Sequence, residues 1–258
     1  MKSEIINGPR FLSYLKYDLT RMWRSHMKAA IVIGLMGLFG YFICVLFNLI
    51  AGQGWSGPGL GARWSLFMAA STVLELYQTR TYGHLTDKRE GSAFLMLPAS
   101  TTEKWLSMML HTLVIVPLLF LVAAFGVDAL LTLLDPSLGM SMAASLFRND
   151  ILSEFAEVSD GMPFGILLSL FIAAFCINFL FFLLCGVCFK KRKIAWAFLI
   201  ILGISILLPI FLQPVSGSVD IEDWTELRHI LTGVSVVLWL IVASLAGGIF
   251  YRLKTLKH

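Results

Sequence analysis

Charged side chains are scarce in this chain, and their scarcity sets its class. Of the 258 residues, 14% are Asp, Glu, Lys or Arg, 58% are hydrophobic, and the mean hydropathy is +0.82. A soluble domain carries about 25% charged residues, so this composition excludes an ordinary soluble protein and favours an integral membrane protein. The four cysteines, Cys44, Cys176, Cys185 and Cys188, all lie in apolar stretches, so no disulfide framework is expected.

Motifs for catalysis or cofactor binding are also missing. The sequence contains no G-x-x-x-x-G-K-[ST] phosphate loop and no H-E-x-x-H metal motif. A literal G-x-G-x-x-G at residues 52–57 follows an apolar span instead of a strand, which argues against a dinucleotide site. Cys185-x-x-Cys188 has no second pair, so packing within a membrane helix is favoured over metal binding. We therefore predict no enzymatic activity, and no cofactor or metal held by this chain.

Six apolar segments predict an all-α, polytopic membrane protein, because each is long enough to cross a bilayer. They form a single transmembrane domain over residues 1–258. Glu75 makes the second segment the most polar, and Pro117 predicts a kink in the third. The segments cover residues 29–51, 61–82, 105–134, 164–189, 194–213 and 230–251.

The basic residues predict the topology. Residues 1–28 carry apolar and basic residues at helical spacing, which is typical of a helix lying in the headgroup plane. Of the 20 lysines and arginines, 17 fall in this segment, in the second and fourth loops and in the C-terminal tail. Because cytoplasmic loops are enriched in these residues, both termini should be cytoplasmic. The net charge of +4 therefore sets orientation in a lipid bilayer, and no nucleic-acid partner is expected.

The loop over residues 86–105 is expected on the cytoplasmic side and has two helix signals. Ser100 and Glu103 form an S-x-x-E capping box, which predicts a helix beginning at Ser100. Pro98 separates it from a shorter helical piece that begins near Asp87. The loop begins with charged residues and continues with apolar ones, a pattern that favours docking to a second protein. A solvated loop with interfacial anchors is the alternative.

Two ionisable residues are expected inside the membrane. Glu75 and His111 belong to consecutive antiparallel spans, each roughly 10 Å from the cytoplasmic boundary. Buried ionisable groups usually face the bundle interior, so we expect the two to face each other or share a water-lined cavity. The alternative is that each is satisfied separately.

Glycines line one ridge of the first span. Gly34, Gly37 and Gly40 recur every three residues, a spacing that lets a second helix approach closely. Helix packing through this ridge could join two copies of the chain or two spans of one chain, and the sequence leaves both open.

The layout resembles the membrane subunits of type-2 ATP-binding-cassette exporters. Arg89-Glu90-Gly91, Leu97-Pro98-Ala99-Ser100 and Glu103-Lys104-Trp105-Leu106 together resemble the "LP-x-S … K" segment of bacterial permeases of this type. The resemblance implies a bacterial inner-membrane permease with a separate cytoplasmic ATPase subunit and a second permease copy or paralogue. It also implies that the loop docks on the ATPase through Asp87, Lys88, Arg89, Glu90, Gly91, Phe94 and Leu95.

A different class of protein remains open. A non-transporting membrane anchor or regulatory protein could bind a cytoplasmic partner through the same loop. The identity of a co-purifying partner separates the two hypotheses, because only the permease requires a Walker-type ATPase.

Overall fold

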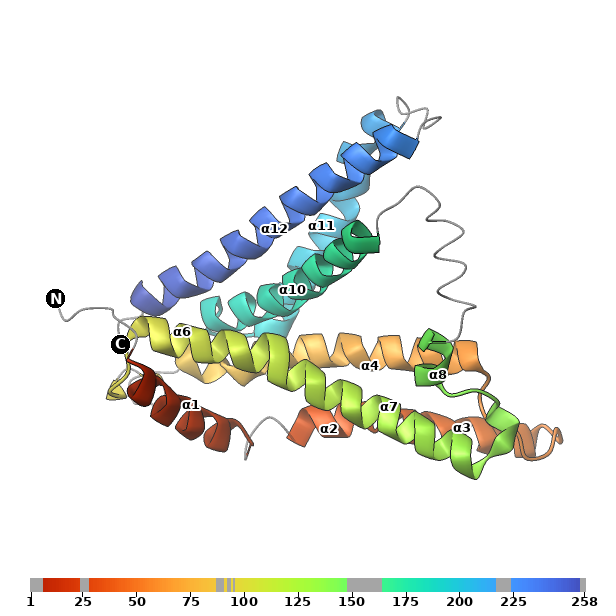
Figure 1. Cartoon of the computed structure of the whole chain (residues 1–258). Coiled ribbons are helices and arrows are strands. Elements are labelled where there is room, and N and C mark those ends of the chain that lie inside the picture. The colour runs from red at the N-terminus through yellow and green to blue at the C-terminus, as the bar shows by residue number, and fades with distance from the viewer. Residues whose placement is uncertain are drawn as a thin grey trace. The chain divides into compact units, whose positions relative to one another are not determined.

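Helices are the only regular elements in the part of the chain that the structure describes (Figure 1). The computed structural model describes residues 7–23, 28–86, 91, 94, 96–147, 164–216 and 224–255. The predicted all-α class is confirmed for these residues. The elements are α1 (Gly8–Met22), α2 (Lys28–Gly34), α3 (Met36–Ile50), α4 (Leu60–Thr81), η2 (Gly83–Thr86), α6 (Thr101–Leu110), η3 (His111–Ile115), α7 (Val116–Leu134), η4 (Pro136–Leu138), α8 (Met142–Phe147), α10 (Phe164–Cys188), α11 (Lys193–Ser216) and α12 (Trp224–Thr255).

Four described helical stretches are long and apolar enough to cross a membrane, which confirms a helical membrane protein at this level. Large apolar side chains on them, such as Ile50 and Leu134, are exposed, as lipid-facing residues would be. α4 and α11 occupy the predicted second and fifth spans but are not among the four, so the count of six stays a prediction. The four stretches are Lys28–Ile50, Thr101–Leu134, Leu168–Cys188 and Arg228–Thr255.

Contacts between helices group the chain into two compact units. Unit 1 contains residues 1–11, 76–106 and 158–258, and unit 2 contains residues 12–75 and 107–157. The boundaries fall inside α1, α4 and α6, so three helices run from one unit into the other. This grouping therefore does not test the single transmembrane domain predicted from the sequence.

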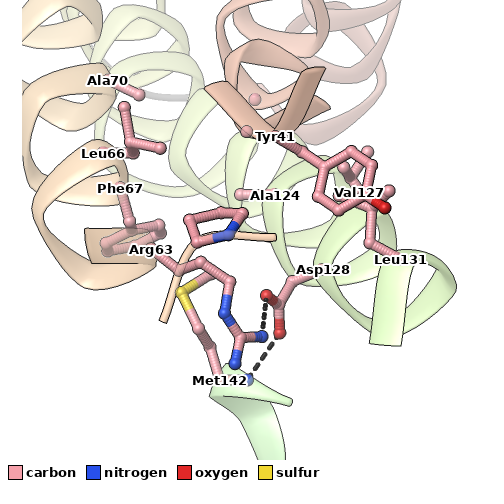
Figure 2. Close-up of a pocket in the computed structure, with 13 residues that line it drawn as sticks. Tyr41, Arg63, Leu66, Phe67, Ala70, Ala124, Val127, Asp128, Leu131 and Met142 are labelled. Atoms are coloured by element: carbon pink, nitrogen blue, oxygen red, sulfur yellow. Dashed lines mark hydrogen bonds and ion pairs between the residues drawn. The ribbon is translucent and has the colours of Figure 1, made fainter. Parts of the chain in front are cut away.

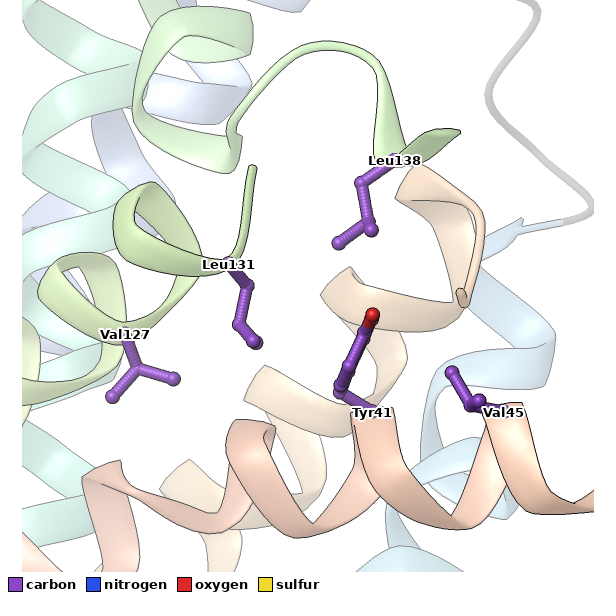
Figure 3. Packing of buried hydrophobic residues seen from close by; sticks show 5 residues of the cluster. All are labelled: Tyr41, Val45, Val127, Leu131 and Leu138. Atoms are coloured by element: carbon purple, nitrogen blue, oxygen red, sulfur yellow. The ribbon is translucent and has the colours of Figure 1, made fainter. Parts of the chain in front are cut away.

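Unit 2 is built where α2 and α3 pack on α7. Its core contains a cluster of buried side chains from these helices and from the turn after α7 (Figure 3). Four aromatic rings of α4 and α7 contact one another nearby, in edge-on, tilted and stacked pairs with centroids 5.3–6.4 Å apart, and add to the packing of the two helices. The cluster is Tyr41, Val45, Val127, Leu131 and Leu138, and the rings are Trp64, Phe67, Phe120 and Phe125.

The helix before α7 changes from α to π geometry over His111–Ile115. Pro117 has no N–H, and its ring would clash with the Leu113 carbonyl in a regular α-helix. In the π turn, Val116 N–H donates to the His111 carbonyl, which widens the helix just before the proline. The tilt or kink predicted at Pro117 stays a prediction, and the change to π geometry just before this proline is a separate finding.

The N-terminal helix lies within the segment predicted for it. α1 covers Gly8–Met22, and residues 1–6 and 24–27 lie outside the described residues. In unit 2, Asp18 is buried, and Ser107 Oγ donates to its Oδ2 at 2.6 Å. This bond ties α1 to α6, while the placement of α1 at the membrane surface stays a prediction.

Unit 1 is built around α10, which packs along α12 and against α11 (Figure 1). Ser169 of α10 shares a hydrogen bond with Ser235 of α12 at 2.9 Å, and Trp239 Nε1 donates to the Ser169 hydroxyl at 2.9 Å. Gly186 allows the closest approach, because an added Cβ there would lie 2.5 Å from the Thr79 carbonyl oxygen of α4. A small residue is therefore required where α10 crosses the end of α4.

Candidate functional site

The 86–105 loop is fastened at its first end by a lysine from a distant turn. η2 follows α4 directly, and its Thr86 side chain is buried. Lys193, at the start of α11, donates from Nζ to Thr86 Oγ1 at 2.8 Å and to the Gly83 carbonyl. This ammonium satisfies groups at both ends of η2, so the entry to the loop is joined to the α10–α11 turn.

A second lysine fastens the middle of the loop. Lys104 is buried, and its Nζ donates to the Phe94 carbonyl at 2.9 Å while lying 5.0 Å from the centre of the Phe94 ring. A charge-assisted hydrogen bond and a cation–π contact thus act on the same residue. Phe94 itself is buried in this arrangement and shapes the loop from inside.

The far end of the loop has the two hydrogen bonds of a capping box. Glu103 N–H donates to Ser100 Oγ at 3.2 Å, and Ser100 N–H donates to Glu103 Oε2 at 2.8 Å. The helix that follows begins at Thr101, so Ser100 is its N-cap residue. The local pattern in the sequence and the local geometry agree here.

Glu103 also binds the N-terminal segment. Arg10 approaches its carboxylate through both Nε and Nη2 at 2.9–3.0 Å, and the Asn7 N–H donates to Oε1 at 3.1 Å. The Glu103 side chain is fully covered, whereas that of Arg10 is 43% exposed. We call the contacts of Lys193, Lys104 and Glu103 with their partners the loop anchor.

Most of the predicted docking residues lie outside the described part of the chain. These are Asp87, Lys88, Arg89, Glu90 and Leu95. The other two, Gly91 and Phe94, are both buried within unit 1. Met96, which was not among the predicted residues, is 83% exposed. The docking role of all seven residues stays a prediction, and Met96 is an exposed apolar side chain that the sequence did not single out.

Unit 2 contains a buried ion pair that the sequence did not reveal. Arg63 of α4 and Asp128 of α7 are 5% and 4% exposed, and Arg63 Nη1 lies 2.7 Å from Asp128 Oδ1 (Figure 2). Arg63 Nη2 donates to the carbonyls of Leu138 and Met140 at 2.8 Å, and the Met142 N–H donates to Asp128 Oδ2. We call this set the Arg63 corner. The two side chains are 65 positions apart, so only the presence of charge in apolar segments could have pointed to them.

A small cavity adjoins the Arg63 corner (Figure 2). Its volume is about 30 Å³, and side chains of α2, α3, α4 and α7 line it. Pockets for small-molecule ligands are typically about 300–1,000 Å³, so this one has room for a water-sized group only. The corner therefore joins helices and holds the turn after α7, and it offers no ligand site of useful size.

A second set of polar contacts holds the end of α7. Tyr41 Oη donates to Asp135 Oδ2 at 2.7 Å and accepts from Trp55 Nε1 at 3.3 Å. The Ser137 N–H donates to Asp135 Oδ1 at 3.0 Å. Bonding to Ser137, and then to Tyr41, lowers the pKa of Asp135, because each donor favours its ionised form. Asp135 is thus held as a charged acceptor at the helix end.

The glycine ridge packs inside the chain. A Cβ added at Gly34 would lie 2.7 Å from Ala123 Cβ and 3.0 Å from the Phe120 carbonyl oxygen of α7. A Cβ added at Gly40 would lie even closer to the Leu66 side chain of α4, whereas one added at Gly37 would have its nearest neighbour 4.0 Å away. These contacts favour the intramolecular alternative for Gly34 and Gly40.

Glu75 and His111 both belong to unit 2. His111 is fully buried at the start of the π turn, and Glu75 is half-buried on α4. The prediction that the two side chains face each other stays a prediction. A water-lined cavity shared by Glu75 and His111 stays a prediction.

Comparisons and metal-binding geometry add no further site. No group of three or more His, Cys, Asp or Glu side chains gathers within the described ranges in a way that could hold a metal ion. No protein-family model matches the chain, and neither a curated protein nor a solved structure is significantly similar to it.

Proposed function

We propose that this chain is the membrane-spanning permease subunit of an ATP-driven exporter of the type-2 ATP-binding-cassette class. The observation that carries the proposal is the loop anchor. Lys193, Lys104 and Glu103 tie the 86–105 loop to α11, to α6 and to the N-terminal segment through charged hydrogen bonds. Because the loop is attached at three points, a displacement caused by a bound partner can be transmitted to α6, α11 and the N-terminal segment.

The proposal includes the membrane topology. The six spans follow from the length of the apolar segments, and the placement of residues 1–28 at the membrane surface follows from their basic and apolar pattern. The cytoplasmic location of both termini and of the 86–105 loop follows from the positive-inside bias. The apolar helices support a membrane location, and the family resemblance supports the bacterial inner membrane.

The proposed mechanism couples a separate ATPase subunit to helix movement. ATP-driven closure of that partner presses on the loop, with Asp87–Gly91, Phe94 and Leu95 as the contact predicted from the resemblance. The movement then reaches α6 through Lys104, which lies in the first turn of that helix, and α11 through Lys193. A second permease copy or paralogue completes the pathway, and transport follows alternating access. The chain hydrolyses no ATP itself and holds no cofactor.

Co-purification in mild detergent tests the proposal. The full chain should retain a Walker-type ATPase, and Lys88→Glu with Arg89→Glu should abolish its retention because two charges at the docking surface are reversed. Lys16→Glu with Lys28→Glu is the matched control, since it reverses two exposed lysines of unit 2.

Two results would contradict the permease. If the loop variant keeps its ATPase, the loop is not the docking site. If the wild-type chain retains a cytoplasmic partner without a Walker motif, the chain is a membrane anchor or regulatory protein.

A further inference from the structure

A basic pocket opens in unit 1 between the end of α4 and the turn from α10 into α11. Its volume is about 370 Å³, roughly ten times that of the cavity beside the Arg63 corner. This volume falls in the range of small-ligand sites. The lining residues are Arg80, Lys190, Arg192, Lys193, Ile194 and Ala195, so four of the six are cations.

Three of these cations are exposed and available to a ligand. Among the residues that the structure describes, no carboxylate forms an ion pair with Arg80, Lys190 or Arg192. Lys193 has a different role, because its ammonium binds Thr86 and Gly83 and so joins η2 to the start of α11. Like charges gathered in one pocket create a positive field that an anion would relieve.

The backbone at Arg192 gives a second, independent indication. Its φ is +51°, in the left-handed region where glycine and asparagine are favoured. An arginine held in this conformation is strained, and such strain is concentrated at functional sites. Arg192 also precedes α11, whose first bond runs from Trp196 N–H to the Arg192 carbonyl. The first amides of α11 therefore have no intrahelical partner and favour an anion nearby.

The surroundings of the pocket place it at the depth of lipid headgroups. The turn lies between the membrane-crossing stretch Leu168–Cys188 and the apolar start of α11, Lys193–Ile204. Trp196 stacks on Phe189 with ring centroids 5.7 Å apart and is itself half exposed. Tryptophan is enriched at the membrane–water interface, which supports this depth.

We propose that Arg80, Lys190 and Arg192 bind the phosphate group of an anionic phospholipid. Ile194 and Ala195 supply an apolar wall for the glycerol and the first acyl carbons, which a free phosphate ion would not use. The site joins α4 to the α10–α11 turn through the lipid. It is independent of the proposed function, because a permease and a membrane anchor would both hold such a lipid.

Lipid titration of the full chain tests this site. Purified protein in mild detergent is mixed with phosphatidylglycerol, and retained lipid is counted by native mass spectrometry. Arg80→Gln and Lys190→Gln should each weaken retention about fivefold, as expected for loss of one cation near an anionic headgroup. Lys191→Gln is the matched control, because Lys191 is an exposed cation of the same turn that does not line the pocket. Its retention of phosphatidylglycerol should equal that of the wild type.

Arg192→Gly separates binding from folding. Glycine relieves the positive φ, so the melting temperature without lipid should rise. The further rise that phosphatidylglycerol produces in the wild type should shrink in this variant, because one cation is gone. A merely misfolded variant would show a lower melting temperature in both conditions.

Three results would overturn the proposal. Equal losses with Lys190→Gln and Lys191→Gln would mean diffuse surface attraction without a site. Equal retention of zwitterionic phosphatidylcholine would mean that charge is not recognised. A rise in melting temperature with millimolar inorganic phosphate as large as that with phosphatidylglycerol would assign the pocket to a soluble anion.

Discussion

In both compact units, charged side chains hold a loop in place, but the two units differ in how far these side chains are buried. In unit 2, Arg63 and Asp128 are both almost fully buried at the end of a turn. In unit 1, Glu103 is covered while its partner Arg10 is nearly half exposed. Removing one member of a buried pair leaves the other charge unpaired in an apolar interior, which is costly. At an exposed pair, water solvates the remaining charge, so the free energy lost is smaller. Breaking the ion pair of the Arg63 corner should therefore cost more free energy than breaking the ion pair between Arg10 and Glu103 in the loop anchor.

The largest effect is expected from Asp128→Ala. It leaves the Arg63 guanidinium buried without its carboxylate, which should lower the free energy of unfolding by about 3–5 kcal/mol. Unfolding of the purified chain in detergent measures this loss. Arg63→Met with Asp128→Leu is the control, and it should be less destabilised than Asp128→Ala because no charge is stranded. A loss below about 1 kcal/mol in Asp128→Ala would remove the distinction between the two units.

Glu103→Ala should have the next largest effect. It removes the capping box and the ion pair with Arg10 together, at a cost of about 2–3 kcal/mol. Glu103→Gln keeps an oxygen for the Ser100 N–H and loses only the charge, so about half of that cost should be recovered. Thermal unfolding ranks the two variants. If they are equally unstable, the ion pair dominates and the cap contributes little.

Lys104→Met should cost about 1.5–2 kcal/mol, because it keeps the buried stem and removes the donor to the Phe94 carbonyl. The loss should be local. Limited proteolysis near the exposed Met96 should therefore become clearly faster, while the melting temperature should fall only slightly. Lys16→Met, at an exposed lysine of α1, is the matched control and should change neither quantity. Unchanged cleavage in Lys104→Met would show that this lysine does not hold the loop.

Arg10→Ala should have the smallest effect, about 0.5 kcal/mol, because a half-exposed cation is screened by water and salt. The difference from the wild type should shrink further in 1 M salt, where the screening length falls to about 3 Å. Thermal unfolding at low and high salt measures both values. A loss as large as that of Glu103→Ala, and independent of salt, would mean that Arg10 behaves as a buried charge.

The parts of the fold that the sequence predicted depend on local signals. The capping box of Ser100 and Glu103 involves groups three residues apart, and its hydrogen bonds are present. The apolar stretches predicted helices because their length and composition are properties of single segments.

The parts that the sequence did not predict depend on contacts between distant segments. Arg63 and Asp128 are 65 residues apart, and Arg10 and Glu103 are 93 apart. Nothing in the spacing of such residues indicates which helix faces which. For the same reason the sequence left two alternatives open for the glycine ridge. The closeness of Gly34 to Ala123 and of Gly40 to Leu66 favoured packing within the chain.

The π turn at His111–Ile115 has a consequence for the phase of the helix beyond it. A π turn takes up about one more residue than an α turn, and each residue of an α-helix advances the side-chain direction by about 100°. Asp128 lies about three and a half turns further on and meets Arg63 from α7. Because the π turn takes up this extra residue, deleting one residue within 111–115 and returning the turn to α geometry should keep Asp128 facing Arg63. Deleting one residue of α7 between Pro117 and Asp128 would instead turn Asp128 by about 100° away from Arg63. The π turn thus lets the helix contain one more residue while the two charges still meet.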